Sequence, residues 1–259
     1  MTNIEDAVSL SDSYYQELSA TAEIRQAFQD ILIAQSQYIF PAISYDKHLT
    51  ERYKNALKLK TVDTSALLKG LLIQAVSIYE NFVRDMVSVV VYKLTSQGAK
   101  YIDLNLKLRN SFISSTGKVL THYGSGTVNG VKYDFDNLTQ SLISCLSFQD
   151  EYHIDPRVFT ILLGNCTSSR ITSLLSVLGV SDDIFDDIKS DSGLKKHFNE
   201  SRMSQVEELT KSGLDELINL RNDIAHGDLT RSLSIDELER AIQLLKTLIK
   251  ALSIRCREN

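Results

Sequence analysis

One segment of the chain, residues 64–96, limits the possible folds more than any other. Apolar side chains recur in it at helical steps and cover nearly every side of a helix. Because a helix that is apolar all round must be buried, the segment predicts a long helix at the centre of the fold. Its main apolar positions are Leu67, Leu68, Leu71, Leu72, Ile73, Val76, Ile78, Tyr79, Phe82, Val83, Met86, Val87, Val89, Val90 and Val91.

Helix breakers are scarce throughout the chain. The 259 residues include 2 prolines, 11 glycines and no tryptophan, which favours long helices over a sheet rich in turns. Hydrophobic residues make up 43% and charged residues 24%, so the chain can bury a core as an ordinary globular protein does. The sequence therefore predicts an all-α fold, or one that is nearly so.

The spacing of apolar residues predicts further helices on both sides of the central one. Between residues 111 and 137, glycines and β-prone residues interrupt this pattern, which predicts a small irregular or β-hairpin insertion. In the segment 181–183, Ser-Asp-Asp is typical of a helix cap. The expected shorter helices cover residues 12–38, 48–58, 138–148, 155–163, 168–178 and 184–188.

The last third of the chain carries two strong helix patterns. Residues 204–225 repeat apolar side chains at helical steps, and Gly227 follows as a natural stop. Ser234 and Glu237 then form a capping box for a helix that continues to residue 252. Because the connection between them is short, we expect the two helices to form an antiparallel pair.

Charge and cysteine usage exclude several classes of protein. The net charge of −5 argues against a surface that attracts polyanions everywhere, although a local basic site is compatible with it. The first thirty residues lack a basic start followed by an apolar run, and charges interrupt the most apolar stretch. We therefore expect a cytoplasmic protein without a membrane span, cofactor or metal. The cysteines fit neither a zinc site nor a disulfide framework, being odd in number and widely spaced: Cys145, Cys166 and Cys256.

One short cluster at a predicted helix end has a chemical interpretation. It reads Arg-Asn-Asp-Ile-Ala-His-Gly from Arg221 to Gly227. An arginine fork suits a phosphate, and a histidine can accept and release a proton near neutral pH, so together they suit RNA cleavage. A purely structural explanation is also open, because cations in the last turn of a helix stabilise its dipole.

The spacing within this cluster predicts how its members could cooperate. Arg221 and His226 are five residues apart, so on a straight helix they point about 140° from each other. Asn222 and His226 are four apart and share a face, so Asn222 could orient the imidazole. Arg221 would then act from the side or from a second subunit, and a dimer would place two such clusters opposite each other.

The same cluster resembles the Arg, four to six residues, His signature of the HEPN superfamily. Tyr-Glu-Asn-Phe at residues 79–82 and the stretch 198–227 are also similar to that superfamily, most of all to the branch called RiboL-PSP-HEPN. The resemblance covers residues 64–96 and 198–254. It implies a helical bundle and leaves the first sixty residues and the middle of the chain unassigned. We predict a single HEPN-like domain over 1–259, with an N-terminal helical extension (1–60), the core helix (64–96), the insertion (111–137), and the motif and C-terminal helices (198–254).

The resemblance also implies an activity. Active members are metal-independent endoribonucleases that leave a 2′,3′-cyclic phosphate and a 5′-hydroxyl, work as homodimers, and act in phage defence or as toxins restrained by a partner protein. His226 would move the proton, and Arg221 would stabilise charge on the phosphate. The alternative is a non-catalytic HEPN module for dimerisation or for binding a nucleotide or partner.

Residues outside the cluster extend the predicted site. Glu80 falls on a buried stripe of the central helix and needs a partner there. That partner is either Arg84, one turn later, or Arg221 or Asn222 from a neighbouring helix. Basic residues flank the motif and could bind RNA as a rim, or they could be ordinary solvated surface: Lys195, Lys196, Arg202 and Arg231.

Overall fold

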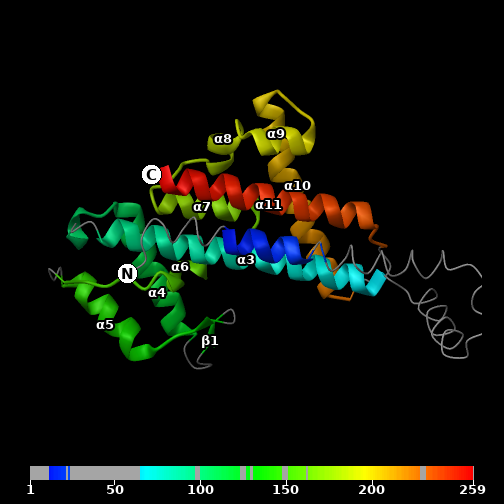
Figure 1. Cartoon of the computed structure of the whole chain (residues 1–259). Helices are drawn as coiled ribbons and strands as arrows, with labels where there is room; N and C mark the ends of the chain where they lie inside the picture. Colours follow the sequence, from blue (N-terminus) through cyan, green and yellow to red (C-terminus); the bar gives the residue numbers. More distant parts are fainter. Residues whose placement is uncertain are drawn as a thin grey trace, which may run out of the picture.

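The computed structural model describes residues 12–21, 23, 65–96, 100–122, 127–128, 131–147, 151–161, 163–227 and 232–258. These residues are predominantly helical, which confirms the all-α prediction (Figure 1). The elements are α3 (Ser65–Ser96), η2 (Tyr101–Asp103), α4 (Leu106–Thr121), β1 (Thr127–Val128), β2 (Val131–Lys132), α5 (Phe135–Leu146), α6 (Arg157–Thr160), α7 (Ser168–Val177), α8 (Ile184–Ile188), α9 (Ser192–Phe198), α10 (Met203–Ala225) and α11 (Ile235–Glu258).

Helix α3 is the centre of the molecule, as its apolar pattern predicts. It packs against α11 most extensively, and also against α10 and α6. By length and composition, the stretch Ala66–Ser96 could cross a membrane, so its charges interrupt the apolar pattern less than expected. However, 61% of that apolar window is buried inside the protein, as in a core helix. The fully buried side chains of α3 include Leu72, Val76, Tyr79, Phe82 and Val87.

Part of the first predicted helix is present and packs on α3. Residues 12–21 are helical, and this segment lies beside α3 in Figure 1 (blue). Tyr14 meets Phe82 edge to face, and its hydroxyl donates a hydrogen bond to the Asp85 carboxylate at 2.6 Å. Leu18 is fully buried. Most of the predicted extension, including the predicted helix 48–58, lies outside the described residues.

The predicted insertion is smaller than 111–137. Residues 111–121 belong to helix α4, and only β1 and β2 form an antiparallel hairpin, which pairs Thr127 with Lys132. The β-prone Val119 is fully buried on the same helix as Leu108 and Phe112, so core packing outweighs its local preference. Gly117 does not end the helix, and a side chain there would meet no neighbour within 4 Å. The prediction of a hairpin is thus correct, but the predicted range is too long, because its two ends belong to helices α4 and α5.

The last two helices are present, but they do not pack chiefly on each other. Gly227, with φ at +94°, adopts the left-handed conformation that ends α10. The capping box before α11 is formed by reciprocal hydrogen bonds between Ser234 and Glu237. Helix α11 packs far more extensively on α3 than on α10. The predicted antiparallel pair is therefore only part of a larger packing in which α3 is the common neighbour.

Three short helices, α7, α8 and α9, connect α6 to α10 along the chain. Asp183 accepts hydrogen bonds from the backbone N–H groups of Phe185 and Asp186, so it caps α8 as the sequence predicts. Asp191 caps α9 in the same way. Figure 1 shows α8 and α9 (yellow) beside α11, whereas α4, α5 and the hairpin (green) lie on the other side of α3. The two groups of helices thus flank the central layer of α3, α10 and α11.

Candidate functional site

Glu80 and Arg221 form a buried ion pair between α3 and α10. Nη2 of Arg221 donates a hydrogen bond to Oε1 of Glu80, although the two residues are 141 positions apart in the chain. Their side chains are only 8% and 16% exposed, respectively. The Nε atom of Arg221 is buried and has no hydrogen-bond partner in the described part of the structure. The last turn of α10 is therefore anchored to the middle of the core helix.

This pairing selects one of the three partners that the sequence left open for Glu80. Arg84, one turn along α3, donates instead from Nη1 to the side-chain oxygen of Asn81, at 3.2 Å. Glu80 thus uses the distant arginine rather than the local one. The pairing satisfies a carboxylate that would otherwise be costly to bury.

Cys166 adds a second contact to the same carboxylate. Its backbone N–H lies 3.4 Å from Oε1 of Glu80. Burial of the thiol raises the pKa of Cys166 to about 12, and the charge of Glu80 adds to this rise. The thiol therefore stays protonated near neutral pH and is a poor nucleophile. We interpret Cys166 as a packing residue that brings the segment before α7 onto the ion pair.

Asp215 holds the start of α7 against α10. Its carboxylate accepts one hydrogen bond from the backbone N–H of Ser168, at 2.7 Å, and another from the hydroxyl of Ser168, at 2.6 Å. Burial, together with the nearby Cys166, Asp215 and Glu80, raises the pKa of Tyr79 well above its ordinary value. Sequence reasoning missed Asp215 and Cys166, because only the tertiary fold brings Asp215 to Ser168 and Cys166 to Glu80.

His226 and Asn222 lie at the open end of α10. His226 is the C-cap residue, and its backbone N–H donates to the carbonyl of Asn222 at 2.9 Å. Its side chain is exposed, whereas Asn222 is partly buried. The described part of the structure contains no hydrogen bond between the side chains of Asn222 and His226. The imidazole is thus accessible, and the backbone of His226 lies about 7.5 Å further along the helix axis than that of Arg221.

Three of the four basic residues predicted as an RNA-binding rim lie at the other end of α10. Lys195 and Lys196 are in the last turn of α9, and Arg202 is the N-cap residue of α10. Arg202 is about 28 Å from Arg221 along α10, so the two cannot hold the same phosphate within one chain. Arg202 also pairs with Glu200 at 3.0 Å. Arg231 lies outside the described residues.

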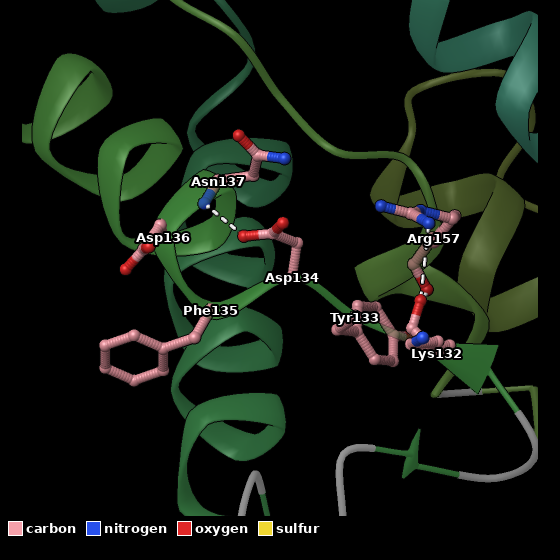
Figure 2. Close-up of a pocket in the computed structure, with 7 residues that line it drawn as sticks. All are labelled: Lys132, Tyr133, Asp134, Phe135, Asp136, Asn137 and Arg157. Atoms are coloured by element: carbon pink, nitrogen blue, oxygen red, sulfur yellow. Dashed lines mark hydrogen bonds between the residues drawn. The ribbon is translucent and has the colours of Figure 1, made fainter.

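The hollow in Figure 2, of about 690 Å³, is a separate feature. It is lined by residues 132–137 and Arg157, and it contains none of the predicted site residues. Arg157 is engaged by Asp155, from which Nη2 lies 2.6 Å away, and the hydroxyl of Tyr133 donates to its carbonyl. These contacts connect the hairpin to α6. We therefore interpret the residues around the hollow as structural rather than as a binding site. Among the described residues, no group of three metal-ligating side chains occurs.

The fold and the site together define a class of protein. It is an all-α protein whose core helix carries a buried carboxylate, paired with an arginine near the exposed histidine at the end of a second helix. Residues 43–258 match the RiboL-PSP-HEPN family, and the chain belongs to that family. The match includes the middle of the chain, which the resemblance left unassigned. No curated protein and no solved structure matches the chain.

Proposed function

We propose that the protein is an endoribonuclease whose active site lies at the end of α10. The observation that carries the proposal is the Glu80–Arg221 pair, which fixes a guanidinium on α10 five residues before the exposed His226. A fixed cation and a titratable base are the two groups that RNA transesterification needs. Membership of the RiboL-PSP-HEPN family supports this choice over other uses of such a pair.

In the proposed reaction the 2′-oxygen of the RNA attacks the adjacent phosphorus. The bond from phosphorus to the 2′-oxygen forms while the bond to the 5′-oxygen breaks. The 2′-hydroxyl loses its proton and the 5′-oxygen gains one, which leaves a 2′,3′-cyclic phosphate and a 5′-hydroxyl. His226 moves one of these protons, and Arg221 stabilises negative charge on the phosphate.

The other two predicted site residues have supporting roles. Glu80 keeps the Arg221 guanidinium in place and acts as a positioning residue, because it is buried and bonded to that guanidinium. Asn222 shares a helix face with His226, and we assign it the task of orienting the imidazole once RNA is bound. No metal ion takes part in this proposal.

The decisive experiment is an RNA cleavage assay with the full chain in EDTA. We expect cleavage with 2′,3′-cyclic phosphate and 5′-hydroxyl ends, and the H226A variant to lose about 10²–10⁴-fold in rate. The matched control is H122A, because His122 is also the C-cap of a helix, α4. H122A should cleave as the wild type does. Cleavage that survives H226A would contradict the assignment.

A homodimer with a composite active site is a further part of the proposal. On one helix, Arg221 and His226 point in different directions, so an arginine from one subunit and a histidine from the other could serve one phosphate. Mixing the separately inactive R221Q and H226A variants tests this idea. Mixed dimers regain an intact site only if each site takes its arginine and histidine from different chains. A mixture that stays inactive would argue against a composite site.

A non-catalytic binding module is the second candidate function. The observation that favours it is the burial of Arg221, whose side chain is only 16% exposed and already has a carboxylate partner. A wild-type protein that cuts no RNA, yet dimerises or binds a nucleotide or a partner such as an antitoxin, would support this alternative. In both cases we propose a cytoplasmic protein, and for the nuclease a role in phage defence or as a toxin.

A further inference from the structure

We propose that Arg84, Arg170 and Arg221 form a phosphate-binding cluster that holds the RNA backbone next to the scissile linkage. The three residues come from α3, α7 and α10: Arg170 and the Glu80–Arg221 pair contact one short segment, residues 163–166, and Arg84 lies one turn after Glu80. The inference rests on the proposed nuclease function, because it assigns an RNA phosphate as the anion that these guanidiniums bind.

The segment 163–166 lies between Arg170 and the Glu80–Arg221 pair. On one side, the backbone N–H of Cys166 approaches the carboxylate that binds Arg221. On the other side, Nη1 of Arg170 donates to the carbonyl of Leu163 at 3.0 Å. The guanidinium of Arg170 lies directly against Gly164, where an added Cβ would come within 1.9 Å of Nη1. This close approach, together with the φ of +48°, explains why glycine occupies the position.

Arg84 completes the cluster from the core helix. It follows Glu80 by four residues and therefore lies on the same side of α3. The charges of Arg84, Arg221 and Arg170 all reach the Cys166 thiol, where each counteracts part of the rise in its pKa. Arg170 and the Glu80–Arg221 pair contact the segment 163–166, and Arg84 lies one helical turn after Glu80, so the three arginines belong to one region that could bind neighbouring phosphates of one strand.

The cluster carries more positive charge than its own contacts neutralise. Among the described residues, Arg84 and Arg170 each bond only to a neutral amide or carbonyl oxygen. Other arginines of this chain have carboxylate partners, as Arg157 has in Asp155 and Arg255 in Asp187. Like charges held together repel one another, and a bound anion would remove that repulsion.

The position of Arg170 also indicates a role beyond fold stability. It lies in the first turn of α7, where the helix dipole disfavours a cation. Its side chain is exposed, and that of Arg84 is partly exposed, so both can reach a ligand from solvent. A guanidinium fork matches the two free oxygens of a phosphodiester. A single RNA strand presents such groups in series, so it can engage several arginines at once.

RNA binding by the full chain tests the cluster. The H226A variant serves as background so that the RNA is not cut, and fluorescence anisotropy with a single-stranded oligonucleotide measures the affinity at several salt concentrations. Adding R84Q or R170Q should weaken binding about fivefold at 0.1 M salt and reduce the salt slope by about 0.7 for each phosphate that an arginine no longer neutralises. Thermal unfolding of each variant verifies that the fold is retained.

The matched control is R240Q. Arg240 is exposed on α11 and, like Arg170, bonds to a backbone carbonyl, here that of Asp236. Its replacement should leave affinity unchanged. If R84Q and R170Q bind RNA as R240Q does, or if the H226A background binds no RNA, the cluster proposal is overturned.

Cleavage assays separate this proposal from the nuclease proposal. If the wild type cuts RNA and the loss of Arg84 or Arg170 changes neither binding nor rate, the nuclease stands and the cluster fails. If the wild type never cuts RNA, yet binding depends on both arginines, the cluster stands and the nuclease fails.

Discussion

The two ends of α10 carry arginine–carboxylate pairs of opposite character. At its start, Arg202 pairs with Glu200, two residues away; the Arg202 side chain is 72% exposed and that of Glu200 is 19% exposed. Near its end, Arg221 pairs with Glu80, 141 residues away, and both side chains are largely buried. The first pair is a local surface contact, whereas the second joins two core helices.

This difference shows where the helix is constrained. A solvated pair contributes little, because water screens the charges and both side chains lose freedom on pairing. In a buried pair, each charge depends on the other, because neither retains its full hydration. The structure thus fixes the motif end of α10 through an ion pair that would be costly to break. The start of α10 carries no comparable constraint from Arg202.

The largest expected effect comes from breaking the buried pair. The E80A variant leaves the Arg221 guanidinium buried without its carboxylate, so we expect a loss of about 3–5 kcal/mol in the free energy of unfolding. Urea unfolding followed by circular dichroism measures it. A loss below about 1 kcal/mol, the range of a solvated pair, would show that Arg221 finds other compensation and that the pair does not anchor the motif.

A double variant separates stability from chemistry at the same position. Replacing Glu80 with Leu and Arg221 with Met removes both charges, so most of the stability lost in E80A should return. RNA cleavage should not return, because the guanidinium is gone. Cleavage by this stable double variant would contradict the role assigned to Arg221.

The next effect concerns Asp215, which connects the motif half of α10 to α7. In D215N the two hydrogen bonds from Ser168 lose their charged acceptor, so we expect a loss of about 1.5–3 kcal/mol. E216Q is the matched control, because Glu216 is the neighbouring residue on the same helix and is more exposed. Equal urea midpoints for the two variants would show that Asp215 is not a structural connection.

Much of this architecture is predictable from sequence, because helical periodicity reports burial directly. The apolar stripes of α3, α10 and α11 and the Ser234–Glu237 capping box identify those elements without tertiary information. The hairpin is harder to delimit, because the β-prone Val119 is held in α4 by core packing. Local preference misleads wherever tertiary burial outweighs it.

The candidate site is only partly predictable, for a different reason. Glu80 needs a partner, and sequence spacing offers the nearby Arg84 as readily as the distant Arg221. Only the packing of α10 on α3 decides between them. Arg170 does carry a signal, since a cation in the first turn of a helix opposes the dipole. That signal does not say which residues lie nearby.

A smaller, pH-dependent effect is expected at the other end of α10. His197 on α9 has its pKa lowered from 6.5 by burial and then by the charge of Arg240. The unfolded chain therefore binds the proton more readily, so stability should fall as the pH drops below about 6.5. Urea unfolding between about pH 7.5 and pH 5 measures how the free energy of unfolding depends on pH. In the H197Q variant this free energy should fall less steeply as the pH drops. An unchanged slope would show that other groups cause it.

The smallest effect is expected at the Glu200–Arg202 pair, in which the arginine is exposed to solvent. A hydrogen bond from the Arg202 side chain lowers the pKa of Glu200 to about 2. Weaker contributions in the same direction come from the backbone N–H groups of Arg202 and Ser201. This shift reflects hydrogen bonds at the surface, where solvent can replace the partner, so E200Q should change the urea midpoint far less than E80A does. Glutamine also keeps an acceptor oxygen for the two N–H groups. If E200Q instead destabilises the protein as strongly as E80A, burial does not distinguish the two ends of α10. The Glu80–Arg221 pair would then stabilise the protein no more than the Glu200–Arg202 pair does.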